Sequence, residues 1–246
     1  MWLLPPIPAL DGPRALARAV LGLAYPALCL GCDRRLSVSI RDDGIPLCPS
    51  CQRTLPRATD AVVAERLAPL PAAQGVFGRT VALWVFDSGG TVQRLQHALK
   101  YRNRPALGRA YGRLLGQALT HAHPHAVYDL VLPIPLSRVR HLERGYNQSH
   151  QLAHGLAEAF TPEPPVRDDL LLRTRPTRSQ TALSRDRRWT NVADAFAVTD
   201  PEAVRDCRVL LVDDVLTTGA TLTAAALPLR DAGATVDLAV FAVAAV

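Results

Sequence analysis

Short apolar runs alternate with amphipathic stretches along most of this chain. The apolar runs predict strands at 81–86, 130–135, 169–173, 192–198, 208–212 and 235–246, the last of them either buried or at a sheet edge. Apolar residues at helical spacing predict helices at 11–23, 92–101, 106–120, 147–160 and 222–229. Strands that alternate with helices favour an α/β domain with a mostly parallel central sheet and helices on both faces.

The stretch from Val209 to Leu222 joins a predicted buried strand to a polar loop. Asp213 and Asp214 follow the apolar run, and the loop Thr217-Thr218-Gly219-Ala220-Thr221 leads into the next helix. Such a loop directs N–H groups and a helix dipole at one spot, which suits a phosphate. The carboxylates would repel that phosphate, so we expect them to face ribose hydroxyls. The pattern predicts a ribose 5-phosphate site; the alternative is an ordinary strand–turn–helix with a polar corner.

Four of the five cysteines form two pairs, Cys29-Leu-Gly-Cys32 and Cys48-Pro-Ser-Cys51, with fifteen residues between them. This spacing is typical of a four-thiolate zinc site. Because four protein ligands leave no open coordination position, we predict a structural Zn²⁺. Two disulfides or a redox pair are the alternatives. Cys207 stands alone and is expected to be a small buried apolar residue.

Length and charge narrow the class of protein. With 246 residues, of which 48% are hydrophobic, the chain can bury a sizeable core. Its first ten residues are broken by prolines and lack a basic start, and no segment has the length of a membrane span, so we expect a cytoplasmic protein. The net charge of +6 favours anionic ligands, either phosphates or nucleic acid. We predict an N-terminal amphipathic helix in 1–25, a zinc ribbon in 26–56, a linker with a short helix in 57–75 and the α/β domain in 76–246.

Basic segments supply candidate anion contacts. Cations from Lys100 to Arg104 lie at the end of a predicted helix, where they either balance the helix dipole or contact an anion. Residues 136–149 are predicted as a cation-rich transition from strand to loop to helix. Thr174–Asn191 is arginine-dense and has too little apolar periodicity for a core element, which leaves a mobile lid, a nucleic-acid surface or a solvated loop. The histidines at 121, 123 and 125 fit a metal site or a solvated loop.

Taken together, these motifs resemble the ComF family of competence-associated proteins, and the likeness covers nearly all of the chain. The four-cysteine segment is followed by Leu99-Lys100-Tyr101, by Pro133-Ile-Pro-Leu136 and by Arg144-Gly-Tyr-Asn-Gln148. The series continues with Arg173, Thr177, Gln180, Leu183, Arg188, Asn191-Val192, Phe196 and the Asp213-Asp214 loop, which itself resembles the phosphoribosyl pyrophosphate (PRPP) loop of type I phosphoribosyltransferases. Arg187 departs from the pattern, because relatives often carry an acidic residue there.

The resemblance implies a type I phosphoribosyltransferase-like fold with an N-terminal zinc ribbon. It implies that Asp213 and Asp214, the catalytic candidates, bind ribose hydroxyls directly or through Mg²⁺, and that Thr217–Thr221 cradles the 5-phosphate. The remaining implied substrate-binding residues are cations: Arg138 and Arg144 near the pyrophosphate, with Lys100 and Arg188. The family is linked to uptake of transforming single-stranded DNA, with a helicase-like competence protein as an implied partner.

Two functions remain open at this point. The fold either serves DNA uptake or processing as a PRPP- or nucleic-acid-binding module, or it transfers phosphoribosyl to a base or amine and releases pyrophosphate. The sequence shows no clear segment for recognising a base, and Trp189 is its one aromatic candidate.

Overall fold

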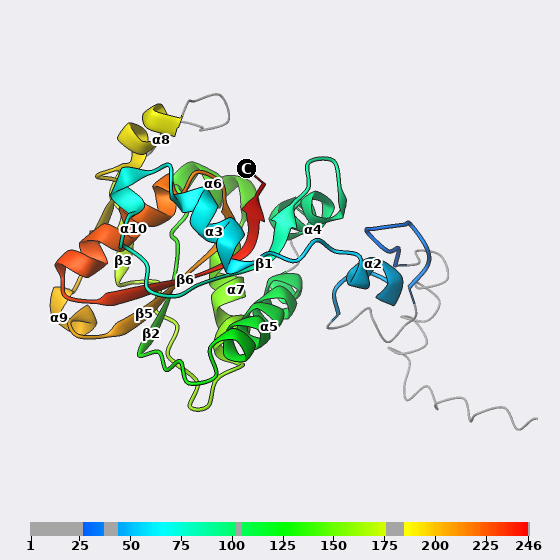
Figure 1. The fold of residues 1–246 in the computed structure, drawn as a ribbon, viewed down its shortest axis with the longest axis horizontal. Coiled ribbons are helices and arrows are strands. Elements are labelled where there is room, and N and C mark those ends of the chain that lie inside the picture. Colours follow the sequence, from blue (N-terminus) through cyan, green and yellow to red (C-terminus); the bar gives the residue numbers. More distant parts are fainter. Residues whose placement is uncertain (1–26, 37–43, 102–104, 176–184, 246) are drawn as a thin grey trace, which may run out of the picture. The chain divides into compact units, whose positions relative to one another are not determined.

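The computed structural model describes residues 27–36, 44–101, 105–175 and 185–245 (Figure 1). The chain divides into two compact units, one ending at Arg53 and the other beginning at Thr54. The finer division at 26–56, 57–75 and 76–246 stays a prediction. The helix predicted at 11–23 lies outside the described residues, as do residues 102–104 and 176–184 of the basic segments.

The described elements follow one another as helices and strands along the chain. In order they are α2 (Pro49–Arg53), α3 (Asp60–Leu67), the 3-10 turn η2 (Pro71–Ala73), β1 (Thr80–Phe86), α4 (Thr91–Tyr101), α5 (Pro105–Ala122), β2 (Leu130–Pro133), α6 (Arg138–Arg144), α7 (Gln148–Ala157), β3 (Leu171–Arg173), α8 (Arg185–Val192), β4 (Phe196–Val198), α9 (Pro201–Val204), β5 (Arg208–Leu216), α10 (Ala220–Asp231) and β6 (Thr235–Ala244).

A four-stranded parallel sheet in the order β1-β6-β5-β2 forms the centre of the second unit. This confirms the predicted α/β class with a mostly parallel sheet. Strand β6 lies between β1 and β5 and is therefore an internal strand, which explains why its apolar run is almost continuous. A separate two-stranded antiparallel sheet joins β3 to β4.

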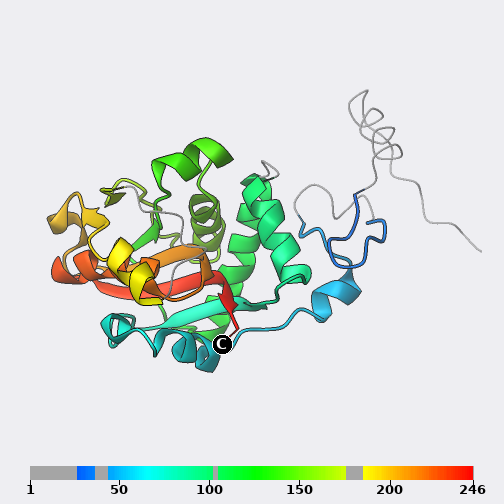
Figure 2. The same cartoon turned by 90° about the horizontal axis from the view of Figure 1, so that it is seen from above.

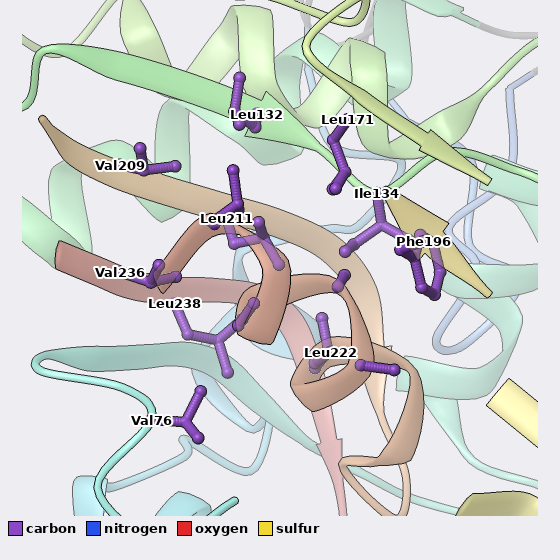
Figure 3. Packing of buried hydrophobic residues seen from close by; sticks show 14 of the residues in the cluster. Val76, Leu132, Ile134, Leu171, Phe196, Val209, Leu211, Leu222, Val236 and Leu238 are labelled. Atoms are coloured by element: carbon purple, nitrogen blue, oxygen red, sulfur yellow. The ribbon is translucent and has the colours of Figure 1, made fainter. Parts of the chain in front are cut away.

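Helices cover both faces of the parallel sheet. Helices α5 and α7 lie on one face, and α3 and α10 lie on the other, as the two views agree (Figures 1 and 2). On the α5 face, the rings of Trp84, Tyr111 and Phe241 pack together with centroids 4.8–6.1 Å apart. On the α10 face, Leu222 packs with the strand residues shown in Figure 3. The same cluster includes Leu67 of α3, so α3 is part of this core.

Three predicted elements differ from the structure. Strand β5 continues beyond Val212 to Leu216, because β6 pairs with it along that length. Helix α6 occupies part of the predicted transition at 136–149. Residues 185–192 form helix α8 instead of a loop, and Val192 and Trp189 pack on the core because residues three apart share one face of a helix. Trp189 is therefore partly buried, and the strand predicted from Val192 begins only at Phe196.

Candidate functional site

The carboxylates Asp213 and Asp214 lie within β5, beyond the point where the neighbouring strand β2 ends. Strand β2 pairs with β5 only as far as Pro133, opposite Val212, and the N–H of Ile134 donates to the Val212 carbonyl at 2.9 Å. Beyond that point, among the strands that the structure describes, β5 pairs with β6 alone. The two side chains therefore lie at the carboxyl end of the sheet, where ligands of parallel α/β sheets usually bind.

Asp214 is held by two side chains of helix α4. The ammonium of Lys100 lies 2.6 Å from its Oδ2, and the amide of Gln96 donates to the same oxygen at 3.3 Å. Gln96 and Lys100 are four residues apart, so they lie on one face of α4. Burial by itself would raise the pKa of Asp214, but the charge and hydrogen bond of Lys100, together with the Arg144 charge and the Val215 N–H, outweigh it and lower that pKa. Asp214 is therefore ionised at neutral pH.

Asp213 has a different environment. The Ser149 hydroxyl donates to its Oδ1 at 2.8 Å, and the N–H of Asp214 donates to the same oxygen at 2.8 Å. Burial and the neighbouring Asp214 charge outweigh these donors and raise the pKa of Asp213 to about 7. The two carboxyls therefore separate into an ionised group and a group that exchanges a proton near neutral pH.

The segment from Gly145 to Ser149 connects the elements around these carboxylates. Gly145 ends α6 with φ at 76°, and Asn147 caps α7 by accepting from the Ser149 N–H at 3.1 Å. The Asn147 amide also donates to the carbonyl of Ile134 at 3.0 Å, and the Tyr146 hydroxyl donates to the carbonyl of Leu99. Helices α4 and α7 are thus fixed to the end of β2, which places Ser149 beside Asp213.

The predicted phosphate loop connects β5 to α10. Gly219 precedes the first residue of α10 and has φ at 79°, a conformation that favours glycine. A Cβ at this position would also lie 2.7 Å from Cδ2 of Leu67. No side chain caps the first turn of α10. Thr217 is exposed, Thr218 is buried and Thr221 is half-buried.

The predicted cations occupy several helices. Arg138 is exposed at the start of α6, and Arg144 is half-buried at its end, where its charge helps to lower the pKa of Asp214. Arg188 lies on α8. Lys100 is the predicted cation in direct contact with the pair. The structure thus brings Lys100, Asp213 and Asp214 together, with Arg144 acting on Asp214 through its charge.

Sequence reasoning gave no role to three residues near the carboxylates. Gln96 and Ser149 each hydrogen-bond to one aspartate. The guanidinium of Arg173, on β3, lies 5.3 Å from the centre of the Phe196 ring. It is also close enough to Asp213 for that carboxylate's charge to act on the pKa of Arg173 in the upward direction. Burial, and then the charge of Arg140, lower the pKa of Arg173. The one sequence signal for Gln96 was its position one helical turn before Lys100.

The four cysteines of the first unit form a compact cluster. Their Sγ atoms all lie within 4.8 Å of one another, and those of Cys32 and Cys48 are 3.7 Å apart. Sulfurs bound to one tetrahedral zinc, each about 2.3 Å from the ion, are about 3.8 Å apart. All four cysteines are free thiols, so neither predicted alternative disulfide is formed. The cluster could therefore hold a metal ion.

Backbone groups favour thiolates in this cluster. The N–H groups of Cys48 and Gly31 donate to the Cys29 sulfur at 3.2 and 3.3 Å. Burial opposes ionisation of Cys29, but these donors, together with hydrogen bonds from the backbone and side chain of Cys32, outweigh it and lower its pKa to about 6. Gly31 is required by close approach, because a Cβ there would lie 2.7 Å from the sulfur of Cys51. The donor set and its spacing fit a thiolate-bound metal.

No family model matches the sequence, but curated proteins do. The chain is 32% identical over 231 residues to the DNA utilization protein YhgH of Salmonella typhimurium, covering 91% of this chain and 93% of that protein. It is 27% identical over 220 residues to competence protein F of Haemophilus influenzae, covering 88% and 90% of the two chains. With competence protein ComFC of Bacillus subtilis it shares 24% identity over 242 residues, covering 89% and 95%.

These relatives define a class of proteins named for DNA utilization or competence. The chain belongs to the ComF family, as the order of its motifs predicted. Among the helices that the structure describes, none combines the length and apolar character needed to cross a membrane.

Proposed function

We propose that this protein acts in DNA uptake or DNA utilization through a type I phosphoribosyltransferase-like domain that binds PRPP or a related ribose 5-phosphate. The observation that supports this cellular role is the similarity to DNA utilization and competence proteins over about nine-tenths of the chain. Single-stranded DNA and a helicase-like competence protein are the proposed partners. Uptake of labelled DNA by a strain that lacks its own relative tests this role. The wild-type gene should restore uptake, and failure to do so would count against it.

The carboxylate pair supports the ribose phosphate site. Asp213 and Asp214 lie at the carboxyl end of a parallel strand, and the uncapped first turn of α10 begins six residues after Asp214. An ionised Asp214 suits a ribose hydroxyl, and the N–H groups of α10 suit the 5-phosphate. Arg138 and Arg144 are proposed to contact the pyrophosphate, with Arg188 as a further contact.

Two metal ions belong to this proposal. Mg²⁺ prefers oxygen ligands, and the carboxylates of Asp213 and Asp214 are such ligands. When bound with PRPP, Mg²⁺ would neutralise part of the pyrophosphate charge. At the cysteine cluster we propose a structural zinc, because four thiolates at this spacing leave no open coordination position.

Binding of PRPP with and without Mg²⁺ to the full chain tests the site. Asp213→Asn/Asp214→Asn should weaken binding by about a hundredfold or more, because two ligand carboxylates are lost together. Asp231→Asn, an exposed carboxylate at the end of α10, is the matched control and should bind like wild type. Equal PRPP affinity in the double variant and the wild type would contradict the proposed site.

An active phosphoribosyltransferase is the second candidate. The observation that favours it is the pKa of about 7 for Asp213, since a carboxyl that exchanges protons near neutral pH can accept one from an incoming nucleophile. Pyrophosphate release from PRPP should be measured with bases, ammonia and single-stranded DNA as acceptors. Release that Asp213→Asn abolishes would identify an enzyme. Retained PRPP binding without release would favour a binding module.

A further inference from the structure

Lys100, which contacts Asp214, is an exception in the composition of the chain. Of its 28 lysine and arginine residues, Lys100 is the only lysine. Arginine presents a rigid planar fork of donors, whereas lysine carries a compact ammonium at the end of a flexible stem. The one basic side chain of this kind lies at the carboxylate pair, with its ammonium 2.6 Å from Oδ2 of Asp214. A flexible point charge suits a contact that forms and breaks.

Helix α4 uses the whole acceptor capacity of that oxygen. A carboxylate oxygen has about two acceptor positions. The Lys100 ammonium fills one of them, and the Gln96 amide, which donates at 3.3 Å, fills the other. A Mg²⁺ ion lies about 2.0–2.1 Å from each oxygen that it binds. It can bind this oxygen only after Lys100 has moved, because the ammonium contacts the same atom at 2.6 Å.

Burial determines when Lys100 can move. The side chains of Lys100 and Asp214 are only 17% and 14% exposed, so water screens their charges poorly. Removing one partner from such a pair is costly unless the other finds a new counter-charge. Mg²⁺ alone offers the ammonium no such partner and repels it. Mg²⁺ together with a phosphorylated ligand brings anionic phosphate oxygens, to which a flexible ammonium can transfer.

We propose that Lys100 is an exchangeable counter-ion of Asp214. It neutralises this carboxylate until a ligand arrives, hinders Mg²⁺ from binding alone, and transfers to a phosphate group of the ligand when Mg²⁺ enters with it. This inference rests on the proposed binding of PRPP with Mg²⁺ and adds an order of events to it. The metal ion binds together with the phosphorylated ligand and not before it.

Binding of Mg²⁺ alone to the full chain tests the counter-ion. Isothermal titration calorimetry compares wild type with Lys100→Met, which removes the charge, and Lys100→Arg, which keeps it. Lys100→Met should bind Mg²⁺ at least about tenfold more tightly than wild type, because no ammonium then opposes the metal at this carboxylate. Lys100→Arg should bind it as weakly as wild type. Arg94→Met, which removes an exposed cation from another face of α4, is the matched control and should be unchanged.

A variant of Gln96 separates charge from access. Gln96→Leu frees the second acceptor position of the same oxygen but leaves Lys100 in place, so its Mg²⁺ affinity should remain close to that of wild type. Asp214→Asn in the Lys100→Met chain should remove the added affinity, which assigns it to this carboxylate. Equal Mg²⁺ affinity in Lys100→Met and wild type would overturn the proposal, and so would an equal gain in Gln96→Leu. Neither result depends on whether PRPP binds.

The wild-type protein provides a second test that does not depend on how the variants fold. Lysine isotopically labelled at Nζ yields a single side-chain NMR signal, since Lys100 is the only lysine. Mg²⁺ alone should leave this signal in place, and PRPP with Mg²⁺ should shift it. An equal shift with Mg²⁺ alone, or no shift under conditions where PRPP is bound, would contradict the exchange. Absence of PRPP binding would instead contradict the proposed function, and the Mg²⁺ affinities of the variants would still decide the role of Lys100.

Discussion

Carboxylates lie at both ends of the parallel sheet, and the two groups differ in how their charge is balanced. At the start of β6, Asp237 is completely buried and contacts Nη1 of Arg79 at 3.3 Å and of Arg208 at 3.2 Å. The Tyr128 hydroxyl donates to it at 3.1 Å. At the carboxyl end of β5, two carboxylates lie side by side, and the Lys100 ammonium contacts one of them.

This difference distinguishes Asp237, a carboxylate with a structural role, from the Asp213–Asp214 pair, which is available to bind a ligand. Asp237 faces two guanidinium groups and a phenol, and it also accepts the Arg79 N–H at 2.8 Å. Its charge is balanced within the protein. In the Asp213–Asp214 pair, two carboxylates lie beside one Lys100 ammonium, and burial together with the Asp214 charge raises the pKa of Asp213. Such a pair is stabilised by an external cation or by donated hydroxyls, whereas Asp237 needs neither.

The largest effect on stability is expected from Asp237→Asn. The substitution removes a buried charge and leaves Arg79 and Arg208 without their carboxylate. Their side chains are 35% and 36% exposed, so hydration recovers part of the loss, and we expect a cost of about 2–4 kcal/mol in the free energy of unfolding. Chemical denaturation measures it, with Asp213→Asn as the matched change at the other end of the sheet. Equal costs in the free energy of unfolding for the two variants would contradict the distinction between Asp237 and Asp213.

The next effect depends on pH. The pKa of Asp213 in the folded chain, about 7, lies above that of an unfolded aspartate, so the folded chain holds more protons between about pH 4 and pH 7. This carboxyl therefore lowers stability as pH rises through that window. The lowered pKa of Asp214 acts in the opposite sense, at more acidic pH. The free energy of unfolding of Asp213→Asn, relative to that of wild type, should therefore rise by on the order of 1–3 kcal/mol as the pH increases from about 5 to about 8.

Denaturation midpoints at the two pH values measure this gain, with Asp231→Asn as the control. A gain that is equal at both pH values would show that Asp213 does not change its protonation on folding.

A matched pair of cation deletions sharpens the comparison further. In Arg79→Met, Asp237 keeps Arg208, so we expect a loss of less than about 1 kcal/mol. In Lys100→Met, Asp214 loses the ammonium at 2.6 Å, and the carboxylates repel each other more strongly. We expect a loss of about 1–2 kcal/mol at about pH 8 and a smaller one at pH 5, where Asp213 is protonated. Similar losses at both pH values would argue against charge repulsion as the cause.

Ser149→Ala should have the smallest effect. It removes one hydroxyl donor from the Asp213 carboxylate, at 2.8 Å, and should cost about 1 kcal/mol or less. Because that donor favours the ionised form, its loss should move the pKa of Asp213 further upward. NMR titration of the side-chain carboxyl carbons measures the shift. Ser137→Ala, which removes the hydroxyl that caps α6, is the control and should leave the Asp213 titration unchanged.

The parts of the fold and site that are contiguous in sequence could be predicted from it. The strands and several helices were visible as apolar runs and helical spacing, and the cysteine pairs predicted a cluster that the structure confirms. The family followed from motifs that retain their order along the chain. Asp213 and Asp214 stood out because they follow a buried run directly, although pairing with β6 extends the strand beyond them.

The contacts between distant segments could not be predicted in this way. Lys100 meets Asp214, and Ser149 meets Asp213, only because of the strand order and the packing of α4 and α7. Asp237 lies in an apolar run, and nothing near it in the sequence indicates that its partners are Arg79, Arg208 and Tyr128. Helix α8 was missed because tertiary packing of a few apolar residues outweighs its polar composition.

The position of β6 also sets constraints on how the second unit folds. Strand β1 joins the described sheet through β6, with Thr80 opposite Leu238. Strand β1, which is early in the sequence, therefore cannot pair until β6, near the end of the sequence, is in place. Closing so long a loop costs chain entropy before any pairing is gained, which slows folding. During synthesis, β1 and β5 would each leave the ribosome with an unpaired edge. We therefore expect this unit to need protection from aggregation until Thr235–Ala244 has been made.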